Sequence, residues 1–197
     1  LIRVALLVLL MVALFLVGSL LARPAAAESP HEQVGIVLIM DNSGSMKTND
    51  PNGLRFTAAR LFLALLDDGD AAGVIQFATG SQPLSEGIQA LGSAADRLAL
   101  IERIQPAVGD GWTDLYAAMA DAQTMLEGFD AAGRQMVIVL LTDGIPEVAG
   151  QPAGYEADTL ALARSLNVPV LSIALTTEAQ TPFLYRVAAD TGGSVVP

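Results

Sequence analysis

The chain has 197 residues, 52% of them hydrophobic, and a formal net charge of −11 at pH 7. This length and composition suffice for one domain with a hydrophobic core. Residues 1–27 carry two arginines and no acid, so the rest of the chain has a net charge of −13. Such an acidic chain is a poor partner for nucleic acid or for an anionic membrane surface. The absence of cysteine excludes a disulfide framework and thiol chemistry.

The first 27 residues are typical of an export signal. Arg3 precedes a predominantly apolar run at residues 4–22, and three alanines follow at residues 25–27, as at a signal-peptide cleavage site. A run of this length also spans a bilayer about 30 Å thick, so an uncleaved membrane anchor is the alternative. With either reading, we expect the remaining chain to be exported, to the periplasm or the extracellular space, and to be secreted or anchored through residues 4–22.

Residues 28–33 are expected to form a linker and residues 34–197 one domain, in which apolar runs alternate with segments of helical period. In chain order, the expected elements are strand 34–40, helix 54–66, strand 72–78, a weaker edge strand 83–91, helix 94–104, helix 113–129, strand 134–143, helix 156–167, strand 168–175, helix 182–190 and strand 194–197. The last strand is incomplete at Pro197, so we expect the native chain to continue beyond it.

The expected strands are apolar throughout, which favours a mostly parallel sheet covered by helices on both faces. Their alternation with helices predicts βαβ units and a three-layer, doubly wound α/β domain. Apolar residues also share one face of several expected helices. These residues are Leu54, Ala58, Leu61 and Leu65 in the first helix, Leu98, Ile101 and Ile104 in the second, and Leu115, Met119, Ala122 and Leu126 in the third.

Polar oxygen donors follow two of these strands. Asp41, Ser43 and Ser45 come directly after strand 34–40, and Asp143 ends strand 134–143. Thr113 stands where a glycine-containing loop turns into a helix. In open α/β sheets the carboxyl ends of the strands form the ligand-binding edge, so we expect all five side chains to meet there. Two carboxylates and three hydroxyls make an oxygen-only shell that suits Mg²⁺ or Mn²⁺.

Three other kinds of site fit less well. An EF-hand loop that starts at Asp41 lacks the required Gly at its sixth position and the Glu at its twelfth, which are Met46 and Asn52. No Walker-type phosphate loop is present. A serine hydrolase needs a base, and the single histidine, His31, lies outside the domain pattern.

With these residues in view, the sequence from about residue 33 to 197 resembles the von Willebrand factor A (VWA) domain. The D-x-S-x-S run, the loop threonine and the T-D-G run match that family's metal-ion-dependent adhesion site at Asp41, Ser43, Ser45, Thr113 and Asp143. The resemblance implies strand order 3-2-1-4-5-6 with the edge strand antiparallel. It also implies a bound ion, Mg²⁺ or Mn²⁺, that accepts an Asp or Glu carboxylate from a protein partner.

The resemblance implies a binding module for adhesion or for assembly of an envelope complex, and no catalysis. The alternative is a docking or regulatory domain of a larger enzyme whose catalytic part lies beyond Pro197. Near the site, Trp112 is either an interface anchor or a ring packed on the sheet edge. Asp114 reads as a first-turn helix acid, Thr113 as a possible N-cap, and Glu147 as a surface loop acid. The oligomeric state and the partner's identity are not encoded in any motif.

Overall fold

The computed structural model describes residues 32–144, 146–175 and 182–196. The expected signal or anchor at residues 1–27 lies outside the described residues. The chain divides into two units, Leu1–Glu32 and the compact Gln33–Pro197, and all the described strands and helices belong to the second. Within the described residues, no helix is long and apolar enough to cross a membrane.

Strands and helices alternate along the described chain, as the sequence predicts. In order, they are β1 (Val34–Asp41), α2 (Met46–Asn49), α3 (Leu54–Ala64), β2 (Ala71–Phe77), β3 (Ser81–Pro83), β4 (Gln89–Ala90), α4 (Ala94–Arg103), α5 (Leu115–Glu127), β5 (Gln135–Thr142), α6 (Tyr155–Ser165), β6 (Val170–Ala174), α7 (Pro182–Thr191) and β7 (Ser194–Val196). The short helix α2 is the one helix in this series that the sequence pattern did not predict.

The sheet has the order β3-β2-β1-β5-β6-β7, and β4 also pairs with β2. β1 lies parallel to both β2 and β5, and β6 and β7 extend the parallel part. This confirms the doubly wound fold and the order 3-2-1-4-5-6, when β3 and β4 together count as the third strand. In register, Asp41 pairs with Phe77, and Met40 with Leu141, so the ends of the three central strands meet at one edge.

The antiparallel edge differs from the single strand predicted at residues 83–91, because it forms two short strands, β3 and β4. Between them the side chain of Ser85 replaces a ladder hydrogen bond. Its buried hydroxyl accepts from the Val74 N–H at 2.9 Å and donates to the Gly87 carbonyl at 2.8 Å. A side-chain hydrogen bond of this kind satisfies the backbone while the chain leaves the strand.

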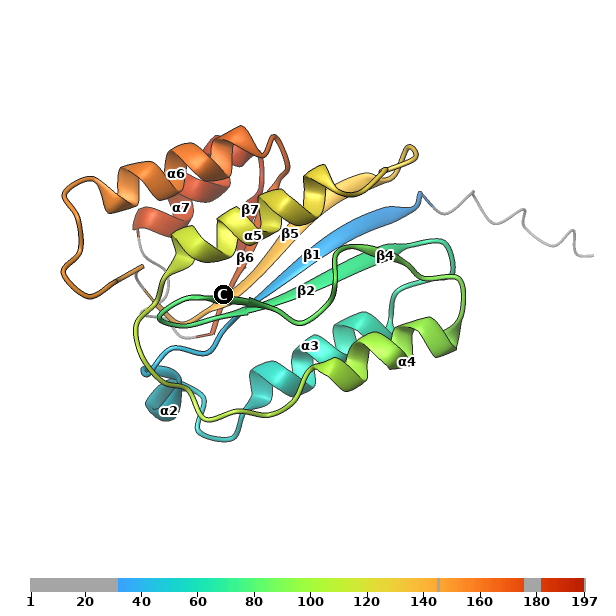
Figure 1. Cartoon of the computed structure of the whole chain (residues 1–197), viewed down its shortest axis with the longest axis horizontal. Helices are drawn as coiled ribbons and strands as arrows, with labels where there is room; N and C mark the ends of the chain where they lie inside the picture. The colour runs from blue at the N-terminus through green and yellow to red at the C-terminus, as the bar shows by residue number, and fades with distance from the viewer. Residues whose placement is uncertain (1–31, 145, 176–181, 197) are drawn as a thin grey trace, which may run out of the picture. The chain divides into compact units, whose positions relative to one another are not determined.

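Helices cover the two faces of the sheet, with α5, α6 and α7 on one and α3 and α4 on the other (Figure 1). The alternation of side chains along β1 feeds both cores. Val37 and Ile39 pack with the α5, α6 and α7 side, whereas Leu38 and Met40 pack with the α3 and α4 side. Both cores are therefore anchored on the strand that ends in Asp41.

The apolar face predicted for the helix at residues 54–66 is not the one that α3 buries. Leu54, Leu61 and Leu65 are 64%, 60% and 72% exposed. The helix instead buries Phe56, Ala59 and Leu63 together with Arg55. This segment has two apolar faces of helical period. The face that is buried is the one next to Arg55, because Arg55 makes its contacts inside the protein.

A smaller correction concerns α4. Leu98 is 54% exposed, although the sequence pattern groups it with Ile101 and Ile104, whereas Leu100 and Ile104 are buried. The prediction for α5 holds better. Leu115, Met119 and Ala122 are buried along the face that meets the sheet.

Candidate metal centre

Asp41 ends β1 as a fully buried carboxylate with fixed hydrogen bonds. Its Oδ1 accepts from the backbone N–H of Ser43 at 2.8 Å, and its Oδ2 accepts from the Thr142 hydroxyl at 2.7 Å. Thr142 belongs to the neighbouring strand β5, so the contact ties the ends of β1 and β5 together. The sheet therefore orients Asp41 before any ligand is present.

A chain of side-chain hydrogen bonds continues from this loop to Asp143. The hydroxyls of Ser43 and Ser45 lie 3.0 Å apart, and the Ser45 hydroxyl donates to Asp143 Oδ1 at 3.0 Å. Asn49, at the end of α2, donates from Nδ2 to Asp143 Oδ2 at 2.9 Å. Four of the five predicted site residues are thus gathered at the carboxyl edge of the sheet.

Thr113, the fifth predicted residue, reaches the same edge through backbone contacts of its loop. The Gly44 N–H donates to the Gly111 carbonyl at 3.0 Å, and the Asp110 N–H donates to the Asn42 carbonyl at 2.9 Å. Thr113 itself is nearly buried, and it exchanges two backbone hydrogen bonds, of 2.8 and 3.0 Å, with Glu147. The loop before α5 therefore lies directly against the loop after β1.

Two glycines make this close approach possible. A Cβ added to Gly109 would lie 2.3 Å from the Ser43 carbonyl oxygen, and one at Gly111 would lie 2.0 Å from the Thr79 hydroxyl. Gly111 also has a φ of +76°, in the left-handed region that favours glycine. A side chain at Gly109 would push the Thr113 loop away from the loop that carries Ser43, and a side chain at Gly111 would push it away from Thr79, which follows β2.

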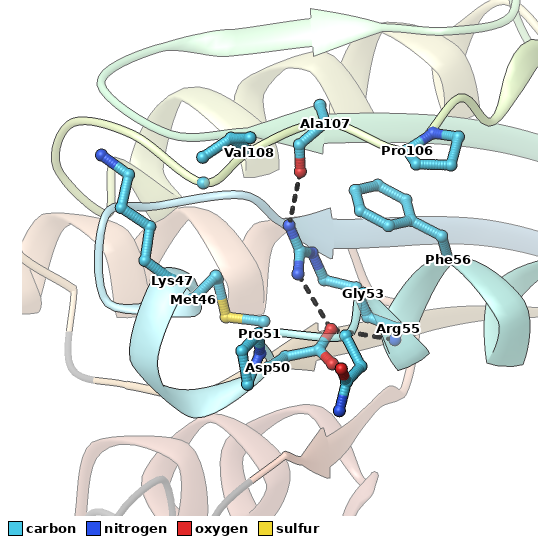
Figure 2. A pocket seen from close by; sticks show the side chains of 12 residues that line it. Met46, Lys47, Asp50, Pro51, Gly53, Arg55, Phe56, Pro106, Ala107 and Val108 are labelled. Atoms are coloured by element: carbon cyan, nitrogen blue, oxygen red, sulfur yellow. Dashed lines mark hydrogen bonds and ion pairs between the residues drawn. The ribbon is translucent and has the colours of Figure 1, made fainter.

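Arg55 is a buried cation that bonds to Asp50 and to Ala107 (Figure 2). Its Nη1 donates to Asp50 Oδ2 at 2.8 Å, in an ion pair whose side chains are only 2% and 6% exposed. Its Nη2 donates to the Asn42 side-chain oxygen at 2.5 Å and to the Ala107 carbonyl at 3.2 Å. One guanidinium thus joins α3, the loop after β1 and the loop before α5.

Asp50 has a second role, at the start of α3. Its two carboxylate oxygens accept from the backbone N–H groups of Leu54 and Arg55 at 2.7 and 3.0 Å. Free N–H groups at a helix start favour such a negative charge. The same carboxylate therefore caps the helix and holds Arg55 in place.

Four residues that support the site, Asn42, Asn49, Asp50 and Arg55, belong to no motif that the sequence alone shows. An acid shortly before a predicted helix, with an arginine in its first turn, is the signal that could have drawn attention to Asp50 and Arg55. Asn42 and Asn49 carry no comparable signal, because asparagine is common in turns. Their contacts arise only when distant loops meet.

The electrostatics of the site favour a cation. Burial raises the pKa of Asp41, and the nearby Asp143 carboxylate raises it further, while hydrogen bonds from Ser43 and Thr142 act in the opposite direction. Ionised together, the two carboxylates repel each other in a poorly solvated place. A divalent ion would relieve that repulsion, and the donor set of carboxylate and hydroxyl oxygens fits Mg²⁺ or Mn²⁺.

Within the described ranges, no three His, Cys, Asp or Glu side chains cluster in a way that could hold a metal ion. The candidate shell has two carboxylates only, and the rest of its donors are hydroxyl oxygens. Such a shell balances the charge of a divalent ion without exceeding it.

The rim of the site combines charged and apolar groups. Lys47 lies 3.3 Å from Asp110, whose pKa is lowered by a hydrogen bond from the Gly111 N–H and by the lysine. Trp112 is 41% exposed, and its backbone N–H donates to the Thr79 hydroxyl. The exposed Glu147 belongs to the surface loop, as its sequence context predicts.

Asp114, rather than Thr113, caps helix α5. Its Oδ1 accepts from the Ala117 N–H at 3.0 Å and from the Tyr155 hydroxyl at 2.8 Å. The helix begins at Leu115, two residues later than the sequence pattern predicts, which leaves Thr113 outside it. The Thr113 hydroxyl is therefore not needed as a cap.

The chain has a doubly wound α/β fold, and its D-x-S-x-S loop lies with Thr113 and Asp143 at the carboxyl ends of the strands. These two features define a class of α/β domains with a polar site at that edge. The family model of the von Willebrand factor type A domain matches residues 36–145, more than half of the chain. The chain belongs to this family.

Among known proteins, the chain is similar to the mouse (Mus musculus) calcium-activated chloride channel regulator 1, with 34% identity over 128 residues. This match covers 62% of the chain and only 14% of the mouse protein.

Two of the solved structures that share the fold illustrate the likeness. One is a von Willebrand factor type A protein from Catenulispora acidiphila, with a TM-score of 0.70 and 21% identity, over 83% of this chain and 38% of that one. The other is the manganese-loaded TRAP protein of Plasmodium vivax, with a TM-score of 0.64 and 20% identity, over 84% of this chain and 68% of that one. At these identities the likeness concerns the fold.

Proposed function

We propose that this domain binds one divalent metal ion, Mg²⁺ or Mn²⁺, and through it an Asp or Glu side chain of a protein partner. Asp41, Ser43, Ser45, Thr113 and Asp143 would hold the ion. The observation that carries the proposal is the hydrogen-bonded chain from Asp41 through the two serines to Asp143, at the carboxyl edge of the sheet. The manganese in the related TRAP structure supports the choice of ion.

The bound ion would supply a positive charge to a face that is otherwise acidic. The chain's own residues do the rest. The serine and threonine hydroxyls offer oxygen ligands without adding negative charge, and the hydrogen bonds from Thr142 and Asn49 keep the two carboxylates oriented. Trp112, exposed at the rim, would add apolar contact area around the partner's carboxylate.

We further propose that the domain is exported, to the periplasm or the extracellular space, and is secreted or anchored through residues 4–22. In that setting the module would serve adhesion or the assembly of an envelope complex. A second function is a docking or regulatory domain within a larger enzyme. The chain covers only 14% of the mouse relative, so a domain of this kind can be one part of a longer protein. This observation favours the second function.

Calorimetric titration of Mg²⁺ and Mn²⁺ into residues 28–197 tests the metal site, because this range contains the compact unit Gln33–Pro197. We expect saturable binding at a single site, and loss of that binding in Asp143→Asn. Glu102→Gln is the matched control, since it removes one negative charge from an exposed position in α4. Equal metal binding by Asp143→Asn and the control would refute the assignment.

A further inference from the structure

A groove of about 750 Å³ lies between α5, α6 and the loop at residues 148–152. Its walls include Tyr116, Val148, Tyr155 and Leu162, so much of its surface is apolar. A hollow of this size is in the range that holds a ligand side chain or a short peptide segment.

The groove adjoins the rim of the metal site along both chain segments that border it. Asp114, in the groove wall, directly follows Thr113, and Val148 directly follows Glu147. Thr113 and Glu147 are held together by a pair of backbone hydrogen bonds. The groove is therefore a neighbour of the metal-site rim, close enough for one partner segment to contact both.

The charge of the groove is negative. The described residues that line it include two acids, Asp114 and Asp158, and no Lys, Arg or His. Asp158 is exposed on the first turns of α6. Asp114 is held in place by the Tyr155 hydroxyl, which donates to its Oδ1 and accepts from the Tyr116 N–H at 3.1 Å. The hydrogen bonds fix one carboxylate beside two aromatic rings, one of which, Tyr116, is 42% exposed.

We propose that this groove is a second contact site for the partner, and that it takes an arginine or lysine located a few residues from the carboxylate that binds the metal. The apolar stem of such a side chain would lie against the tyrosine rings, and its cationic head would meet Asp114 and Asp158. This inference rests on the proposed function, since the metal site supplies the first contact. It defines the partner motif as one acidic and one basic residue on the same segment.

The test uses short fluorescein-labelled peptides with a Gly-Ser background and one Asp. In each peptide an Arg stands about two to six residues before or after the Asp, a span of roughly 7–20 Å in an extended chain. Matched peptides carry Gln in place of Arg. Fluorescence anisotropy measures their affinity for residues 28–197, with Mg²⁺ or with EDTA, for the wild type, Asp158→Asn and the charge-matched control Glu102→Gln.

We expect the best Arg peptide to bind about five- to tenfold more tightly than its Gln counterpart. This preference should shrink to less than twofold in Asp158→Asn and persist in Glu102→Gln. Equal affinities of the Arg and Gln peptides, or a preference that survives in Asp158→Asn, would overturn the inference. Mg²⁺-dependent binding of the Gln peptides would then still support the proposed function.

A failure of the proposed function can also be distinguished from a failure of the groove proposal. If no peptide binds in an Mg²⁺-dependent manner, the proposed function loses its support, and an Arg peptide without Asp tests the groove alone. The methyl NMR signals of Ala161 and Leu162 should then shift on addition of this peptide in the wild type but not in Asp158→Asn. Such shifts would support the groove as a binding site for basic segments. Unchanged methyl signals would overturn that as well.

Discussion

Arg55 donates a hydrogen bond of 2.5 Å to the side-chain oxygen of Asn42, the residue between Asp41 and Ser43. This contact joins a buried cation in α3 to the loop that carries three of the five candidate metal ligands. The guanidinium also pairs with Asp50 and bonds to the Ala107 carbonyl. The position of the metal loop therefore depends on a residue that is itself outside the ligand set.

The first prediction concerns Arg55→Met. The substitution leaves the Asp50 carboxylate buried without its cation, and breaking a buried ion pair in this way costs about 3–5 kcal/mol of unfolding free energy. It also frees Asn42, so we expect the Mn²⁺ dissociation constant to rise about tenfold, equivalent to ~1.4 kcal/mol. Urea unfolding and calorimetry measure the two effects. The double variant Asp50→Asn/Arg55→Met removes both charges and should recover part of the lost stability.

A second prediction separates the charge of Asp41 from its hydrogen bonds. Asp41→Asn removes a buried negative charge beside Asp143 yet can still pair with the Ser43 N–H and the Thr142 hydroxyl. In EDTA we expect its unfolding free energy to equal that of the wild type or to exceed it by about 1 kcal/mol. Asp41→Ala leaves both partners unpaired and should cost about 1–3 kcal/mol for each.

Neither Asp41 variant should bind Mn²⁺. Urea unfolding in EDTA ranks their stabilities, and calorimetry measures metal binding. If Asp41→Asn unfolds at a lower urea concentration than Asp41→Ala, the hydrogen bonds are not what Asp41 contributes to the fold.

The close contact at Gly109 gives a third prediction. Gly109→Ala places a methyl group 2.3 Å from the Ser43 carbonyl oxygen, so the two loops must separate. We expect a loss of about 1–3 kcal/mol in stability, typical of overpacking, together with weaker Mn²⁺ binding. Gly80→Ala is the control, because nothing lies within 4 Å of a Cβ at Gly80. Equal behaviour of the two variants would show that the loops tolerate the separation.

The fourth prediction uses the pH dependence of stability. Burial raises the pKa of the Tyr155 hydroxyl, and its bond to the Asp114 carboxylate adds to the shift. A raised pKa means that the folded protein retains this proton after the unfolded chain has lost it. Stability from this group is therefore complete below the ordinary tyrosine pKa of about 10 and declines as the pH rises above it.

Tyr155→Phe should remove that part of the alkaline decline. Urea unfolding at a series of pH values from neutral to alkaline measures the slope for each protein, and Tyr185→Phe is the control on an exposed tyrosine. A slope in Tyr155→Phe as steep as in the wild type would contradict the prediction.

The fold was predictable because its strands are unusual in composition. Runs such as residues 34–40 are apolar at every position, which favours a strand covered on both faces. The helix faces were harder to predict. Leu54, Leu61 and Leu65 follow the same helical spacing as the residues that α3 buries. Which of the two faces is buried depends on where Arg55 finds its partners.

The candidate site was also predictable only in part. Asp41, Ser43 and Ser45 are close in sequence and follow a strand, so a motif identifies them. Asn49 and Thr142 bond to the two site carboxylates, and their roles exist only in the folded protein. Spacing along the chain carries no information about such long-range contacts. Sequence therefore indicates the candidate ligands, and the structure adds the groups that orient them.

The hydrogen bond between Ser45 and Asp143 joins residues that are 98 positions apart in the chain. An unfolded chain rarely brings such distant groups together, because closing a loop of that length costs entropy. The candidate shell can therefore form only after β1 and β5 have paired and the Thr113 loop has docked. High-affinity metal binding would then report that the domain has finished folding, and paramagnetic Mn²⁺ would serve as a probe of the last step of assembly.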